Sequence, residues 1–123
     1  MAQTVTSQQG NDLDARLLDF VREKIDTFIK WDLVRFFHDN PYSANTAENI
    51  AKFAARDPQV VASELDELAA SGVLEVSDTG NRRIYRYASD QQTRDLVRDF
   101  VSACDDRDFR VRVKQVIEAY GKS

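Results

Sequence analysis

Three arginines cluster within one short segment in the second half of the chain, at Arg82, Arg83 and Arg86. A guanidinium group donates paired hydrogen bonds to carboxylate or phosphate oxygens, so such a cluster can bind an acidic partner or a nucleic-acid backbone. A structural explanation competes with this one, because the same arginines could pair with Glu75 or Asp78 on a solvated hairpin. The choice between the two depends on the elements that carry these residues.

The chain lacks the residue sets that catalysis and metal binding require. Its one histidine, His38, has no evident nucleophile beside it, and there is no Gly-rich phosphate loop and no Cys/His ligand spacing. Its one cysteine, Cys104, precedes Asp105 and Asp106, and neighbouring carboxylates disfavour a reactive thiolate. We therefore predict a protein that is not an enzyme, with no cofactor and no metal site, in which Cys104 is a packing residue.

Length and composition are typical of one soluble globular domain, with 123 residues, 42% of them hydrophobic and 31% charged. Residues 1–11 are polar and lack the apolar segment of a secretory signal, so they are predicted to be a disordered tail before a single domain at residues 12–123. No apolar run reaches the length of about 18 residues that a membrane span needs, and one cysteine cannot form an internal disulfide. A cytoplasmic protein without a membrane partner is expected.

The first half of the domain reads as helices. Apolar residues recur at helical spacing over residues 12–38 without glycine or proline, which predicts one long helix or two helices end to end. The pattern must end near Asn40 and Pro41, because a residue that precedes proline avoids helical backbone. Asn45 with Glu48 three residues later resembles a capping box, which predicts a short helix from about residue 46 to residue 55.

A further helix is delimited by cap residues at both ends. Asp57 as N-cap and Pro58 at the first helical position predict its start, and Gly72 predicts its left-handed end. Its inward face is predicted to consist of the aliphatic residues at i, i+4 and i+7, namely Val61, Leu65 and Leu68.

Two strands and two more helices complete the pattern. Strands are predicted at residues 73–77 and 83–88, with Gly80 and Asn81 supplying the positive φ angles of a tight hairpin turn. Residues 90–104 are predicted to be helical, and a last helix opens at residues 105–106.

Residues 50–74 and the hairpin after them resemble the helix-turn-helix of bacterial and archaeal regulators of the ArsR and MarR kind. The matching pieces are Ile50-Ala51, the break Ala54-Ala55-Arg56, the aliphatic stripe Val61, Leu65 and Leu68, Gly72-Val73-Leu74, and the hairpin Asn81-Arg82-Arg83-Ile84-Tyr85-Arg86-Tyr87. The resemblance implies a mainly α (α+β) fold: a winged helix-turn-helix module at residues 31–89 with a two-stranded wing. It also implies flanking helices at residues 12–30 and 90–123 that dimerise. At the break, the family has a glycine where this chain has Ala55.

The same resemblance implies a homodimeric transcriptional regulator that binds DNA. The third helix would enter the major groove, where Gln59 and Ser63 are the donors available to base edges. Arg82, Arg83 and Arg86 would contact the DNA backbone from the wing.

An alternative function is a winged-helix module that binds protein and not DNA. Three carboxylates on the third helix, Glu64, Asp66 and Glu67, would meet phosphates unfavourably, and the net charge of the chain is −4. A positive surface that joins the third helix to the wing would favour DNA, and a continuous negative surface would favour a protein partner.

Two further clusters allow more than one interpretation. The aromatic residues of the early helices indicate core or dimer interface, or else a ligand pocket; they are Phe28, Trp31, Phe36 and Phe37. The basic residues of the last helix indicate a solvated face; they are Arg107, Arg110, Arg112 and Lys114.

Overall fold

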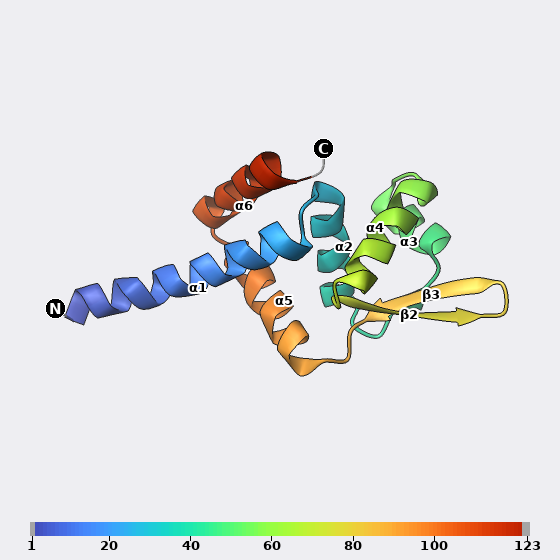
Figure 1. Ribbon diagram of the computed structural model, residues 1–123, viewed down its shortest axis with the longest axis horizontal. Helices are drawn as coiled ribbons and strands as arrows, with labels where there is room; N and C mark the ends of the chain where they lie inside the picture. The colour runs from blue at the N-terminus through green and yellow to red at the C-terminus, as the bar shows by residue number, and fades with distance from the viewer. Residues whose placement is uncertain (1, 122–123) are drawn as a thin grey trace.

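The structure, a computed structural model, describes residues 2–121 and, of these, the side chains of residues 13–121. The chain is mainly helical with one small antiparallel sheet, which confirms the predicted α+β class (Figure 1). The elements follow in the order α1 (Ala2–Lys24), α2 (Phe28–Asp39), β1 (Ala44–Asn45), α3 (Ala47–Ala54), α4 (Pro58–Ala70), β2 (Leu74–Thr79), β3 (Arg82–Tyr87), α5 (Gln91–Ala103) and α6 (Arg107–Tyr120). None of the helices in residues 2–121 is long and apolar enough to cross a membrane.

Two helices, and not one, occupy the first third of the chain. They are separated at residues 25–27, where Thr27 adopts an extended conformation and its hydroxyl accepts a hydrogen bond from the backbone N–H of Lys30. This side-chain cap begins α2 and turns it away from α1. The backbone of residues 2–11, which were predicted to be a disordered tail, is helical and continues α1. Extending an anchored helix costs less than nucleating a new one, and no proline interrupts this segment.

The short helix α3 is capped by a different residue from the one predicted. Thr46 is the N-cap, and its hydroxyl accepts from the backbone N–H of Asn49. Asn45 instead lies in β1, where its amide donates to the hydroxyl of Ser43. The capping-box prediction was therefore wrong by one residue, because pairing with β3 holds Asn45 in extended backbone.

The turn between α3 and α4 has the left-handed backbone that a glycine usually provides. Ala55 has φ 54° and ψ 46°, and it is the one non-glycine residue with positive φ in the described chain. The predicted caps of α4 are confirmed: Asp57 accepts from the backbone N–H of Gln59, Pro58 is the first helical residue, and Gly72 has φ 87° after the last turn. The direction in which α4 leaves α3 is thus set by four consecutive residues, 55–58.

The sheet has three strands in the order β1-β3-β2, so the predicted two-stranded wing was incomplete. The β2–β3 hairpin forms in the expected place, with Thr79 opposite Arg82 across a two-residue turn. Gly80 in that turn has φ 63°, whereas Asn81 does not have the positive φ that was predicted for it. This combination is that of a type II′ turn, which needs positive φ at its first central residue alone.

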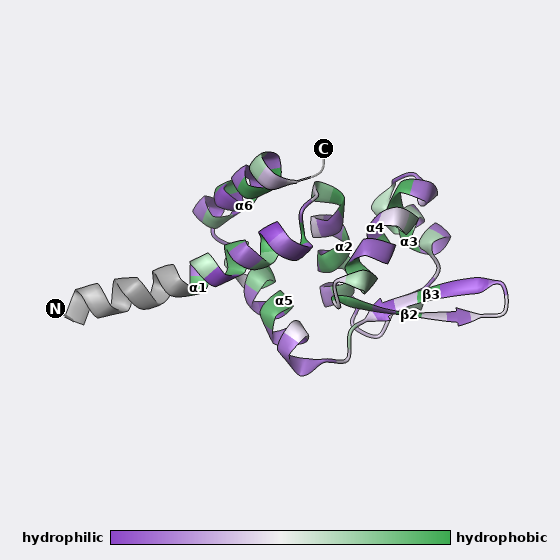
Figure 2. Cartoon of the chain, viewed as in Figure 1, coloured by the Kyte–Doolittle hydropathy of each residue, from purple (hydrophilic) through white to green (hydrophobic). Residues whose placement is uncertain are grey.

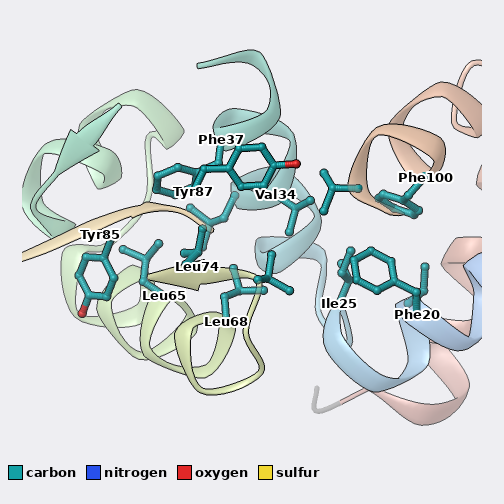
Figure 3. Close-up of a cluster of buried hydrophobic side chains, with 14 of the residues drawn as sticks. Phe20, Ile25, Val34, Phe37, Leu65, Leu68, Leu74, Tyr85, Tyr87 and Phe100 are labelled. Carbon is teal, nitrogen blue, oxygen red and sulfur yellow. The ribbon is translucent and has the colours of Figure 1, made fainter. Parts of the chain in front are cut away.

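The core beneath α4 joins α2, α4 and the hairpin (Figure 3). Val61, Leu65 and Leu68 are fully buried, which confirms the predicted helical phase of α4. They pack with residues that the hairpin and α2 contribute, among them Leu74, Tyr85, Tyr87, Val34 and Phe37. Burying an aliphatic side chain of this size stabilises the fold by roughly 1.5–3 kcal/mol.

A second set of apolar contacts joins α1, α5 and α6. The rings of Phe20 and Phe100 lie 6.0 Å apart edge to face, and those of Phe100 and Phe109 lie 6.3 Å apart. The buried positions of α1 and α6 line the same contact, with Leu17 and Val21 on one side and Val113 and Ile117 on the other. In Figure 2 the free end of the hairpin is mainly hydrophilic, whereas these helices alternate between hydrophobic and hydrophilic residues. Most of the apolar residues that suggested a dimer interface are therefore covered within the single chain.

Candidate nucleic-acid interface

The exposed side of α4 carries uncharged polar side chains, and one residue of this helix, Asp66, contacts the hairpin. Gln59 and Ser63 are exposed and lie four residues apart, so they share one face of the helix. A hollow of about 460 Å³ lies between this helix, the first turn of α3 and the hairpin. Its polar lining comes from Thr46, Glu48, Asn49, Asp66, Asn81, Arg82, Arg83 and Tyr85. Of the predicted site residues, Arg82 and Arg83 line the hollow, whereas Gln59, Ser63 and Arg86 do not.

The three hairpin arginines do not share one face of the sheet. Side chains alternate along a strand, so Arg83 lies on the same face as the buried Tyr85, and Arg82 and Arg86 lie on the opposite face. Arg82 and Arg86 are exposed, and no carboxylate in the described chain is within ion-pair distance of either. Their charge is available to a ligand, whereas that of Arg83 is engaged by protein groups.

Arg83 is held by what we call the Arg83 cluster, formed with Asp66, Asp78 and Tyr85. Its Nε donates to Asp66 Oδ1 at 3.0 Å and to the Tyr85 hydroxyl at 3.2 Å, and its Nη1 donates to Asp78 Oδ1 at 3.1 Å. The Tyr85 hydroxyl donates to the same Asp66 oxygen at 2.5 Å. Hydrogen bonds to Asp66 and Tyr85 raise the pKa of Arg83, and burial together with the Asp66 bond raises the pKa of Tyr85. The cluster ties the hairpin to α4.

Two of the three α4 carboxylates point away from this side of the molecule. Lys30 is almost fully buried, at 3% exposed, and its Nζ donates to Asp26 and to Glu67, each at 2.5 Å. Glu64 lies 3.9 Å from the same Nζ and accepts from the Thr27 hydroxyl at 2.7 Å. These groups form the Lys30 cluster at the junction of α1 and α2. The predicted electrostatic conflict between α4 and phosphates is therefore limited to Asp66.

The sequence also suggested Glu75 as a partner for the hairpin arginines. Glu75 lies opposite Arg86 in the register, but its Oε2 accepts from the backbone N–H and the hydroxyl of Ser89, each at 2.8 Å. These two bonds lower the pKa of Glu75, and the charge of Arg86 contributes less. Glu75 thus fixes the segment that leads from the hairpin to α5.

Asn49 and Asn81 are among the residues that line the hollow but were not assigned to the site from the sequence. Asn49 is exposed in the first turn of α3, and Asn81 is exposed in the hairpin turn. Lys52, one turn further along α3, is also exposed and lines a shallow groove shared with Pro58. Thr46 was the sequence signal that could have identified Asn49. If Thr46 is recognised as the N-cap, Asn49 lies in the first turn of α3.

The remaining chemically notable residues are His38, Cys104 and the other possible metal ligands. Within the described side chains, no three His, Cys, Asp or Glu residues are close enough together to hold a metal ion. His38 is half-buried beside Asp39. Burial raises the pKa of the Cys104 thiol to about 11, so it is protonated and unreactive at neutral pH.

Comparison with known proteins found no protein similar to this chain. No protein-family model, no curated protein and no solved structure matches the chain. Function has to be inferred from the geometry of the interface itself.

Proposed function

We propose that this chain is a DNA-binding transcriptional regulator built as a winged helix-turn-helix, with α3 and α4 as the helix-turn-helix and the β2–β3 hairpin as the wing. In this proposal α4 enters the major groove, where Gln59 and Ser63 contact base edges. The observation that carries it is the composition of the exposed side of α4: Gln59 and Ser63 are exposed and uncharged, Asp66 binds the hairpin residue Arg83, and Glu64 and Glu67 are turned towards Lys30.

The wing contributes positive charge in two forms. Arg82 and Arg86 are exposed and form no ion pair with the described side chains, so they contact phosphates directly when the wing lies along the backbone. Arg83 reaches DNA by exchanging Asp66 or Asp78 for a phosphate oxygen, which keeps its guanidinium paired throughout. Asn49 at the start of α3 offers a further donor beside the same hollow.

The regulator acts as a homodimer in this proposal. Two copies of α4 related by a two-fold axis, about 34 Å apart, would read two half-sites on one side of the duplex. The helices α1 and α6, which lie side by side, supply the dimer contact through apolar residues left exposed, Leu13 on α1 and Val111 and Tyr120 on α6. Sedimentation equilibrium at micromolar concentration measures this directly, and a monomer at high micromolar concentration contradicts it.

A mobility-shift assay with fragments of the host genome at low salt tests DNA binding. Specific complexes are expected at nanomolar protein, and non-specific complexes at roughly micromolar protein. Absence of any complex at tens of micromolar, on the order of the weakest non-specific affinities, would refute the proposal.

Single substitutions then separate base contacts from backbone contacts. Arg82→Ala is expected to weaken all complexes alike and to lower the slope of log affinity against log salt by about one. Gln59→Ala is expected to relax the preference at one base pair by about 1–3 kcal/mol and leave the slope unchanged. Arg107→Ala is the matched control, because Arg107 is exposed at the start of α6, away from the hollow.

The alternative is a winged-helix module that binds protein through α4 and does not bind DNA. Asp66 favours it, because this carboxylate lies on the outward side of α4 and neutralises the nearest arginine. Asp66→Asn distinguishes the two functions. It is expected to strengthen DNA binding by removing a repelled charge, and a variant that still fails to bind any DNA supports the protein-binding function.

A further inference from the structure

A second concave surface lies on the other side of α2, among α2, α5 and α6. It contains a hollow of about 550 Å³ with two aromatic side chains, Phe28 and Trp31, on its wall. A smaller hollow of about 240 Å³ follows between α2 and α3, lined by Leu33, Phe36 and Phe53 among others. The two hollows adjoin at Asp32, which lines both, and we call them together the α2 groove.

Both hollows expose large aromatic side chains at their edges. Phe28 is 42% exposed, and Phe53 is 71% exposed with its ring 5.6 Å from that of Phe36. Trp31 is half-buried, and its ring lies 6.2 Å from that of Phe100 in the core. Apolar area at both ends of a groove is typical of a surface that is covered by a partner. A small molecule in the larger hollow would leave Phe53 uncovered.

The groove is positively charged although the chain as a whole carries a net charge of −4. Four cations line the larger hollow, Arg35, Arg56, Arg110 and Lys114, against two carboxylates, Asp32 and Asp105. Arg56 donates to Asp32 at 2.7 Å and so neutralises it.

Two of these cations lie without a carboxylate partner. Arg110 donates to the backbone carbonyls of Cys104 and Asp105, at 2.6 and 3.2 Å, and no ion pair in the described chain involves Arg110 or Lys114. Arg35 has Asp39 at 3.9 Å, at the margin of an ion pair, and is largely exposed. The surplus of positive charge selects an acidic partner.

We propose that the α2 groove docks an acidic amphipathic segment of another protein, with two apolar side chains that enter the two hollows. Phe28 and Phe36 are eight residues apart on α2, which corresponds to about 12 Å along the helix. A helical partner segment spans this distance between residues seven or eight positions apart, a spacing typical of helices that bind in grooves. Acidic residues between and beside the two anchors meet Arg35, Arg110 and Lys114.

This surface is separate from the proposed DNA interface. The residues that line the α2 groove and those that line the hollow beside the hairpin have no member in common. Figure 1 places α6 and the hairpin on opposite sides of α2. A partner segment and a DNA duplex can therefore bind at the same time, and the docking proposal does not depend on DNA binding.

Peptide display from an unbiased random library against the full chain tests the proposal. Selected peptides are expected to be rich in Asp and Glu and to share two apolar residues seven or eight positions apart. Their binding is then titrated by the fluorescence of Trp31, the one tryptophan of the chain, which reports on the larger hollow directly.

Three variants define where the peptides bind. Lys114→Glu is expected to weaken binding about tenfold through charge reversal, and Phe53→Ser about tenfold through loss of one anchor. Arg107→Glu makes the same charge reversal on an exposed residue of α6 outside the groove, and is expected to change binding less than twofold. Circular dichroism verifies that each variant is folded, which the exposure of all three side chains favours.

Other results overturn the proposal. Peptides that are not acidic, peptides that bind the Lys114→Glu and Phe53→Ser variants as well as the unmodified chain, or no selected peptides at all would each exclude this docking site. Benzoate or inorganic phosphate that alone changes Trp31 fluorescence and displaces the peptides completely would identify a small-anion site in the larger hollow instead.

Discussion

Two ion clusters hold α4 from opposite sides, and they differ in burial more than in composition. The Lys30 cluster joins α4 to the α1–α2 junction through a lysine that is 3% exposed. The Arg83 cluster joins α4 to the hairpin through an arginine whose side chain is 45% exposed. Each cluster contains one cation and at least two carboxylates.

The difference in burial separates a structural cluster from one that can exchange partners. A buried ion that loses its partner cannot recover hydration, so removing one member is costly, on the order of 3–5 kcal/mol. Exposed ion pairs are screened by water and salt, and their partners are replaced at little cost. The Lys30 cluster therefore sets the position of α4, and the Arg83 cluster can open towards a phosphate.

The largest effect is expected from Lys30→Met, which keeps an unbranched side chain one atom shorter and removes its charge. The ammonium group that Asp26, Glu64 and Glu67 share would then be lost, and we expect a loss of about 3 kcal/mol in the free energy of unfolding. Urea denaturation measures this loss. Lys52→Met is the matched control, since Lys52 is exposed and outside any ion pair of the described chain. If the two substitutions lower the free energy of unfolding equally, burial does not make the Lys30 cluster more important for stability than an exposed lysine.

The same cluster predicts a dependence on alkaline pH. Burial alone lowers the pKa of Lys30, but the hydrogen bonds to Asp26 and Glu67 outweigh it, so the pKa is raised above the ordinary 10.5. The stability that Lys30 contributes is thus fully present below pH 10.5 and is lost as the pH rises through the higher folded-state pKa. The difference in unfolding free energy between the unmodified chain and Lys30→Met should be constant from neutral pH to pH 10.5 and shrink above it. A difference that shrinks well below pH 10.5 would place Lys30 outside such a cluster.

A smaller and opposite effect is expected from Ala55→Gly, which changes neither cluster. Left-handed backbone costs a residue with a Cβ about 1–2 kcal/mol, and a glycine at this position avoids that cost. The greater freedom of glycine in the unfolded chain offsets about 0.4–1 kcal/mol of this stabilisation. A net stabilisation of about 0.5–1 kcal/mol should appear in the same urea series. The DNA affinity of this variant should not change, so it shows whether stability alone affects binding. A destabilised Ala55→Gly would contradict the left-handed turn.

The smallest effect on stability is expected from Arg83→Ala, whose melting temperature should be close to that of the unmodified chain. Binding should respond instead: specific and non-specific DNA complexes weaken by similar factors, and the salt slope falls by about one. Asp78→Asn sharpens the test, because it releases Arg83 from one carboxylate and should strengthen DNA binding. If Arg83→Ala leaves both affinity and salt slope unchanged, the Arg83 cluster is structural and the wing does not touch DNA through it.

Local signals in the sequence were sufficient for α4 and the hairpin. Asp57, Pro58 and Gly72 each act on backbone within a few residues, so their effect on α4 was predictable without knowledge of the rest of the fold. The helical spacing of Val61, Leu65 and Leu68 is also a local property, and it predicted the buried face of α4 correctly. The strand β1 was not predictable, because two residues carry no periodic pattern and pair with β3 only once the hairpin is in place.

The candidate site was predicted in part. Gln59, Ser63, Arg82, Arg83 and Arg86 were singled out by residue type and spacing, but spacing along one strand could not show which arginine would meet Asp66, seventeen residues earlier.

The sequence by itself determined the order of the elements from α3 onwards, the caps of α4, the hairpin and the absence of a long apolar span. Only the tertiary structure decided which charged side chains pair with each other, because ion pairs such as Lys30–Glu67 and Arg83–Asp66 join segments that are distant along the chain. Burial and partner together determine whether a carboxylate repels a phosphate or stabilises a junction, and neither is a local property. For that reason a helix with three acidic residues presents one of them, Asp66, on the side of the proposed DNA interface.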